Sequence, residues 1–137
     1  MERMGVRSNP YPVLARGRLP FLKRVFAKIT PVRLYTDSIH FSEPTDIYLS
    51  YCKKHRVYYL DYLHGFPPEQ YVLCPICILE ERVCEYIKES HGVPTSRVLE
   101  AFSDYDPQAV LLTLKLLHQK GKIGYDDELE EWCPWKR

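Results

Sequence analysis

Two short motifs, Cys52-Lys53-Lys54-His55 and Cys74-Pro75-Ile76-Cys77, decide our interpretation of this 137-residue chain. A two-residue gap lets both ligands of a tight turn face one metal ion, and two such turns on neighbouring strands close a tetrahedron of thiolate and imidazole ligands. The eighteen residues between the motifs are rich in Tyr, Val and Leu and have the length of a β-hairpin. The spacing therefore predicts a zinc ribbon that binds one structural Zn²⁺ per chain through Cys52, His55, Cys74 and Cys77.

The sequence leaves the ligand set open at two positions. His64 lies nine residues after His55 and can replace it, and Cys84 lies one or two helical turns beyond Cys77. A set of four cysteines that includes Cys84 suits an iron–sulfur cluster. A further alternative is a group of buried thiols beside a surface histidine. Because four protein ligands leave no open coordination position, we expect the zinc to stabilise the fold and not to catalyse a reaction.

The first 36 residues carry eight Lys or Arg and a single acid, Glu2. Residues 1–19 lack periodicity and predict an extended arm, whereas apolar residues recur at helical spacing from Pro20 to Ile29. Such a basic amphipathic helix can lie on a membrane, contact nucleic acid, fill a partner's groove or pack on the following domain. The arm can also pack on the acidic second half of the chain. We expect nucleic-acid contacts from Arg3, Arg7, Arg16, Arg18, Lys23, Arg24, Lys28 and Arg33.

The periodicity predicts a mixed α+β chain. A period of two predicts strands at residues 32–37, 47–51, 56–63 and 71–73. Helical spacing after the second motif predicts helices at residues 78–91, 94–102 and 106–120, followed by a hairpin at 122–125 and 129–135. We expect a basic arm at 1–31, a zinc-ribbon β-domain at 32–77 and a helical domain at 78–137.

The helical domain resembles a winged helix-turn-helix. The resemblance is based on Val83, Ile87, Val98, Leu99, Phe102, Val110, Leu114 and Leu117, followed by Gly121-Lys122-Ile123-Gly124-Tyr125. Together with the paired metal motifs, it is similar to small factors of archaeal and eukaryotic-type transcription machinery, although no single family matches the whole chain. This resemblance implies a non-enzymatic role in a nucleic-acid assembly.

The third predicted helix indicates which partner the winged helix contacts. In DNA-binding versions this helix presents polar and basic side chains to the major groove. Here Val110, Leu114 and Leu117 suit the core, with Leu111 as a further candidate, and the acidic hairpin repels phosphates. We therefore expect protein docking through Leu112, Lys115, Leu116 and Gln119.

Catalytic motifs such as a P-loop, G-x-S-x-G or His-Glu-x-x-His do not occur, so we expect neither an enzyme nor a small-molecule substrate. No apolar run reaches the roughly 18 to 20 residues of a membrane span, and no secretory signal is present. We expect an intracellular protein, in the cytoplasm or nucleoid, or in the nucleus of a eukaryote. The first hypothesis is a zinc-binding factor that contacts nucleic acid, DNA rather than RNA, in transcription. The alternative is an adaptor subunit of a larger complex whose winged helix docks on protein.

Overall fold

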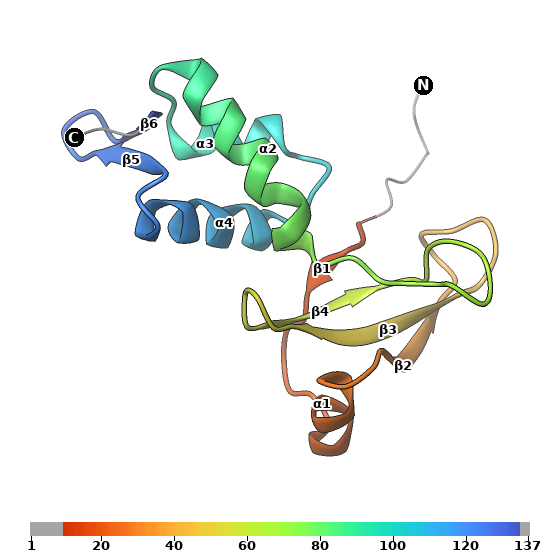
Figure 1. Cartoon of the computed structure of the whole chain (residues 1–137). Coiled ribbons are helices and arrows are strands. Elements are labelled where there is room, and N and C mark those ends of the chain that lie inside the picture. Colours follow the sequence, from red (N-terminus) through yellow and green to blue (C-terminus); the bar gives the residue numbers. More distant parts are fainter. Residues whose placement is uncertain (1–9, 135–137) are drawn as a thin grey trace. The chain divides into compact units, whose positions relative to one another are not determined.

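A four-stranded antiparallel sheet forms the centre of the first of two compact units (Figure 1). The structure is a computed structural model that describes residues 10–134, so the predicted contact residues Arg3 and Arg7 lie outside the described residues. The units divide after Pro75, and the predicted mixed α+β class is confirmed. The sheet order is β1-β4-β3-β2, with the strands β1 (Val13–Leu14), β4 (Val57–Asp61), β3 (Thr45–Cys52) and β2 (Val32–Asp37).

Alternation along the two central strands builds the core of this unit. Ile47 and Leu49 on β3 are fully buried, and Tyr59 on β4 is 5% exposed. On the outer strand β2, the register shifts between Arg33 and Tyr35, which marks a β-bulge. The pairs of inward-facing residues on neighbouring strands fix the register, because a slip by one residue would expose them.

The prediction of a strand at residues 71–73 is wrong. That segment makes a single antiparallel bridge, between His64 and Tyr71. A longer pairing with β4 is blocked because β1 and β3 already occupy both edges of β4. β1 lies within the segment predicted as an extended arm, so the sequence did not show the pairing that excludes residues 71–73.

Tyr11 fastens the residues before β1 to the far end of β2. Its hydroxyl donates a hydrogen bond to Asp37 Oδ2 at 2.6 Å and lies 2.9 Å from the hydroxyl of Tyr35. Its ring stacks on Phe41 with 5.9 Å between the centroids. Burial opposes the ionisation of Asp37, but hydrogen bonds from Tyr11, His40 and the backbone outweigh it and hold the pKa of this carboxyl well below its usual range.

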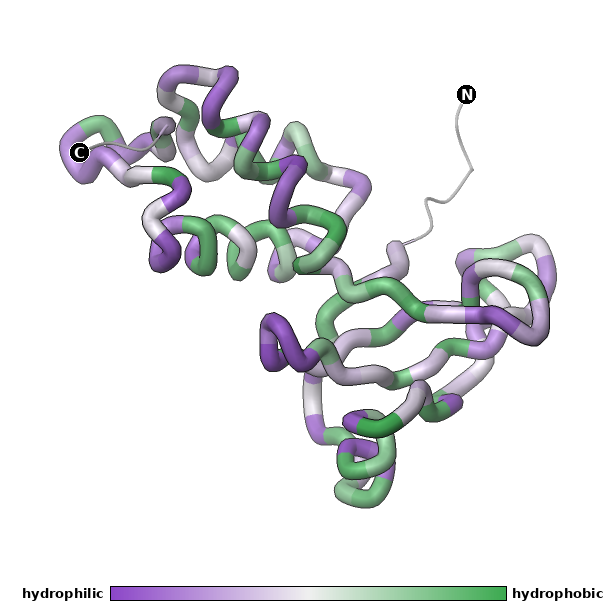
Figure 2. Tube along the Cα trace, viewed as in Figure 1, coloured by the Kyte–Doolittle hydropathy of each residue, from purple (hydrophilic) through white to green (hydrophobic). Residues whose placement is uncertain are grey.

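The short helix α1 (Phe21–Ala27) lies against β3 and β2. It begins directly after Pro20, within the segment from Pro20 to Ile29 that the sequence predicted to be helical. Hydrophobic positions alternate with hydrophilic ones along it (Figure 2). Ala27 is buried, whereas the five large apolar residues from Phe21 to Ile29 are each at least 43% exposed. The alternative that this apolar stripe packs on the following domain is therefore wrong.

The second unit contains three helices and a hairpin. The stripe of Ile76, Leu79, Val83 and Ile87 is buried at helical spacing on the first helix. Two backbone hydrogen bonds join Val93 to Trp132, so the connection after this helix pairs with the hairpin. The elements are α2 (Pro75–Ser90), α3 (Thr95–Ala101), α4 (Pro107–Gln119), β5 (Ile123–Asp126) and β6 (Glu131–Pro134).

Two residues fix the start of α4, which lies within the helix predicted at residues 106–120. Asp106 is the N-cap residue, and its Oδ1 accepts a hydrogen bond from the backbone N–H of Gln108 at 3.1 Å. Pro107 occupies the first helical position, where a missing N–H costs nothing. No helix among residues 10–134 has the length and apolar character that crossing a membrane requires.

We predict that Tyr11→Phe lowers the free energy of unfolding by about 1.5–3 kcal/mol at pH 7, because a hydrogen bond to a buried carboxylate is lost. The lowered pKa of Asp37 means that its ionised form stabilises the fold above pH about 4, and that this stabilisation disappears as the pH falls. The difference between the variant and the parent protein should therefore shrink below pH about 4 in urea titrations. Tyr35→Phe is the matched control, since Tyr35 contacts Tyr11 and not the carboxylate. Equal losses in both variants would contradict this role for Tyr11.

Candidate metal centre

The hairpin turn between β3 and β4 holds the first motif. Cys52 is the last residue of β3, and the backbone N–H of Arg56 donates a hydrogen bond to its carbonyl oxygen at 2.6 Å. Arg56 closes the turn with a φ of 59°, in the left-handed region that few non-glycine residues adopt. This geometry brings His55 Nδ1 to 3.5 Å from Cys52 Sγ.

The second motif lies at the start of a helix and not on a strand, contrary to the prediction. The helix α2 begins at Pro75, directly after Cys74, and includes Cys77 in its first turn. Proline favours this outcome because its fixed φ suits the first helical position.

The four predicted ligands come together. One ligand atom from each of Cys52, His55, Cys74 and Cys77 lies within 4.8 Å of the others. His55 Nδ1 is 4.0 Å from Cys74 Sγ. Bond lengths of about 2.3 Å for Zn–S and 2.0–2.1 Å for Zn–N give a tetrahedron with edges of about 3.6–3.8 Å. The two distances from His55 Nδ1, 3.5 Å to Cys52 Sγ and 4.0 Å to Cys74 Sγ, are close to these edges, and the upper limit of 4.8 Å for the whole cluster exceeds them by about 1 Å.

The chemistry of the donors fits the same conclusion. None of the five cysteines forms a disulfide, so no disulfide competes for the sulfurs. Cys74 is 6% exposed, whereas Cys77 is exposed and Cys52 and His55 are half-buried. The cluster can hold a metal ion at the border of the core, and three thiolates with one imidazole suit zinc.

The two alternative ligands lie outside this cluster in the part of the chain that the structure describes. His64 Nε2 is 2.8 Å from Asp61 Oδ2. Cys84 is half-buried on α2, two helical turns beyond Cys77. The fold thus brings together three cysteines and His55, and not the set of four cysteines that includes Cys84.

Asp61 supports the second motif, and the sequence analysis did not identify it. Its side chain is fully buried at the end of β4, and Oδ2 accepts a hydrogen bond from the backbone N–H of Leu73 at 2.9 Å. Leu73 directly precedes the ligand Cys74. Burial raises the pKa of Asp61, although the Leu73 N–H and His64 favour its ionised form. The available signal was the Asp-x-x-His spacing to His64, which also occurs from Asp37 to His40.

The other predicted site residues do not converge on the metal cluster. The described basic residues, from Arg16 to Arg33, belong to the first unit, and Arg33 Nε lies 3.2 Å from Asp46 Oδ1. On α4, Lys115 and Gln119 are exposed, whereas Leu112 and Leu116 are half-buried.

One detail of the α4 prediction is wrong. Leu111, a candidate for the core in the sequence analysis, is 45% exposed. The buried face of α4 follows Val110, Thr113, Leu114 and Leu117, and Leu111 lies one residue outside that stripe.

Comparisons with known proteins identify no relative. No family model matches the sequence, and neither a curated protein nor a solved structure matches the chain.

We predict that purified protein contains about one zinc ion per chain, because four ligands complete a tetrahedron. Cys74→Ser should lose the metal and lower the midpoint of thermal unfolding, as measured by elemental analysis and circular dichroism. Cys84→Ser and Cys133→Ser are the matched controls and should retain the metal, because both residues lie outside the cluster. Metal-free parent protein, or a brown iron-containing protein, would refute the zinc assignment.

We predict that Asp61→Ala lowers zinc affinity by about 10- to 100-fold, because residues that orient ligands have effects of this size. Competition with a chromophoric chelator measures the affinity. Asp61→Asn keeps an oxygen that accepts the N–H of Leu73, so it should retain most of the affinity. The positioning role is excluded if both variants bind zinc as tightly as the parent protein.

Proposed function

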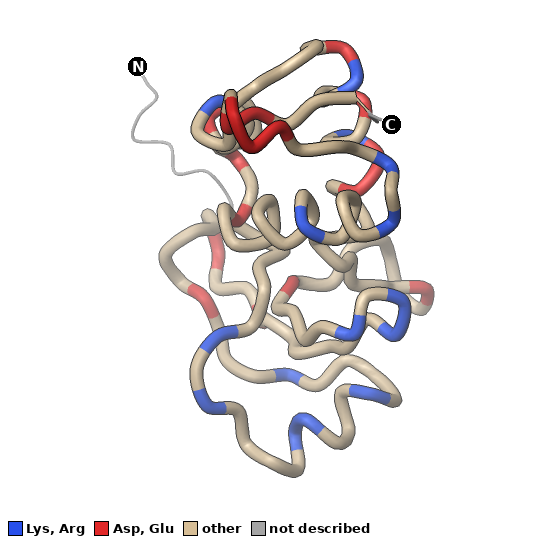
Figure 3. Tube along the Cα trace, turned by 90° about the vertical axis from the view of Figure 1, so that its left-hand side faces the viewer, with Lys and Arg blue, Asp and Glu red and all other residues tan. Residues whose placement is uncertain are grey.

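We propose that this chain is a non-enzymatic, zinc-stabilised factor that binds nucleic acid, DNA in preference to RNA, through the basic side chains of its first unit. The separation of charge between the units supports the proposal. Residues 10–75 contain nine Lys or Arg and five acids, whereas residues 76–134 contain six Lys or Arg and twelve acids. Lys and Arg gather around α1, and Asp and Glu concentrate in the second unit (Figure 3). Clustered positive charge attracts the phosphates of nucleic acid.

The metal turn adds to this basic surface. Lys53, Lys54 and Arg56 are exposed on either side of the candidate ligand His55. The sequence analysis did not include these three residues among the nucleic-acid contacts. A metal-stabilised turn would hold them in a fixed arrangement, which reduces the conformational entropy lost on binding.

We further propose that the first unit is a variant zinc ribbon and that the second unit is a winged helix. The order of α2, α3, α4 and the β5–β6 hairpin supports the second assignment, as does the pairing of Val93 with Trp132 beside the hairpin. Cys77 lies on α2, just beyond the first unit, so the proposed ribbon includes the first turn of this helix and differs from a ribbon with both turns on strands. A role in transcription is part of this proposal and follows from the resemblance of the combined motifs.

The second unit suits protein contact better than nucleic acid. Its excess of acids would repel phosphates, and Leu111 presents an apolar side chain beside the exposed Lys115 on α4. We therefore assign docking on a protein subunit to this unit. In the adaptor alternative, this docking would be the main activity of the chain.

We predict that the full chain binds a duplex DNA of about 20 base pairs, with an affinity that falls steeply with salt. Arg18→Gln with Arg24→Gln should weaken binding several-fold in fluorescence anisotropy, because two phosphate contacts are lost. Lys115→Gln with Lys122→Gln removes the same charge from the acidic unit and should leave affinity unchanged.

The test uses substitutions and not deletion of the arm, because β1 and α1 belong to the first unit and their removal would disturb its fold. If the zinc-loaded chain fails to bind DNA and RNA at low salt, the nucleic-acid proposal is wrong and the adaptor role takes its place.

A further inference from the structure

The helix α1 presents its large apolar side chains to the outside of the first unit. Helical spacing of 100° per residue places Phe21, Leu22, Val25 and Phe26 within an arc of about 140°, with Ala27 on the opposite side, and Ile29 follows the end of the helix. Ala27 is 2% exposed and faces the sheet. The exposed fractions are 67% for Phe21, 64% for Leu22, 43% for Val25, 53% for Phe26 and 79% for Ile29.

Polar and basic groups hold the inner side of α1. The Tyr58 hydroxyl donates a hydrogen bond to the carbonyl oxygen of Arg24 at 3.2 Å. Lys28 Nζ lies 5.1 Å from the centre of the Tyr51 ring, and Lys23 Nζ donates to a backbone carbonyl of β2 at 3.2 Å. These contacts fix the helix in an orientation in which its apolar face cannot be buried by the sheet.

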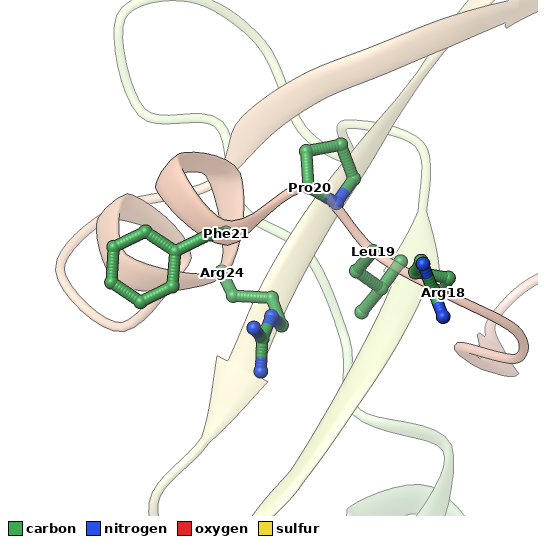
Figure 4. A pocket seen from close by; sticks show the side chains of 5 residues that line it. All are labelled: Arg18, Leu19, Pro20, Phe21 and Arg24. Carbon is green, nitrogen blue, oxygen red and sulfur yellow. The ribbon is translucent and has the colours of Figure 1, made fainter.

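The charged residues of the segment that carries this face are all positive. Arg18 and Arg24 line a shallow pocket together with Leu19, Pro20 and Phe21 (Figure 4). The ring of Phe21 extends from the helix away from the strands (Figure 4). No acid occurs from residue 3 to residue 36. The surface therefore offers apolar side chains and guanidinium groups side by side.

The apolar side chains and positive charges of α1 together favour one kind of binding partner over the others. The phosphates of nucleic acid neutralise the Lys and Arg side chains, but nucleic acid offers no continuous apolar surface for the five apolar side chains. A second copy of α1 would bring like charges together, which opposes association. An anionic bilayer surface accepts apolar side chains below its headgroups and attracts Lys and Arg at the headgroup level. A protruding apolar ridge also needs no preformed groove there.

We propose that α1 and the adjacent Arg18 form a membrane-surface contact for bilayers that contain anionic lipids. Phe21, Leu22, Phe26 and Ile29 enter the interface, and the guanidinium groups of Arg18 and Arg24 bind lipid phosphates or carboxylates. This contact goes beyond the proposed function, because nucleic-acid binding requires the Lys and Arg side chains and leaves the apolar face of α1 unused.

The test uses zinc-loaded full-length protein and two kinds of vesicle, pure phosphatidylcholine and phosphatidylcholine with about 30% phosphatidylserine. Flotation should recover the protein with the anionic vesicles and not with the neutral ones. Phe26→Ser with Ile29→Ser should reduce binding at least about tenfold, because two interfacial anchors are lost. Ile39→Ser with Phe66→Ser is the matched control and should bind normally, since these residues are 72% and 86% exposed on other loops.

The same variants separate this inference from the proposed function. Phe26→Ser with Ile29→Ser keeps every Lys and Arg and should bind DNA like the parent protein, whereas Arg18→Gln with Arg24→Gln should weaken both activities. The membrane contact is refuted if the folded parent protein does not bind anionic vesicles at low salt. It is also refuted if the α1 variant and the control variant bind these vesicles equally. Sedimentation that shows a dimer dissociated by the α1 substitutions would identify a second copy as the occupant and also overturn it.

Discussion

Three sulfur atoms and one imidazole nitrogen, from three separate segments of the chain, lie within 4.8 Å of one another. Thiolates at such distances repel each other strongly in a partly buried site unless a cation lies among them. A metal ion removes this repulsion and converts it into attraction. The candidate ligands come from the β3–β4 turn, from Cys74 and from the first turn of α2, so one bound ion would hold all three in place. The metal would thus contribute folding free energy that a small core cannot supply alone.

Local patterns were sufficient to predict much of this structure. The two metal motifs, the strands β2, β3 and β4, and the helices of the second unit follow from spacing, periodicity and capping residues within short windows. Asp106-Pro107 is a clear example, because capping depends on residues two positions apart. The four ligands could be named because a tight turn limits which side chains meet, although the sequence did not show that the second turn begins a helix.

The features that the sequence did not show depend on contacts between distant residues. β1 pairs with β4 across more than 40 positions, and this pairing excludes residues 71–73 from the sheet. Asp61 accepts a hydrogen bond from the backbone N–H of Leu73, twelve residues away, and so supports the second motif. The orientation of α1 is of the same kind, since its periodicity identifies an apolar face but not the direction in which that face points. These contacts matter for function, because they determine how the second motif is supported and which face of α1 is exposed.

The β-bulge in β2 has a consequence for the behaviour of the chain at high concentration. β2 is an edge strand of the sheet, and a regular edge strand is a template for pairing with a strand of another molecule. The register shift between Arg33 and Tyr35 interrupts the row of donors and acceptors, and the charged side chain of Arg33 lies at the interruption. Such an edge resists ordered aggregation. This protection matters in a protein that also exposes five large apolar side chains on the neighbouring helix.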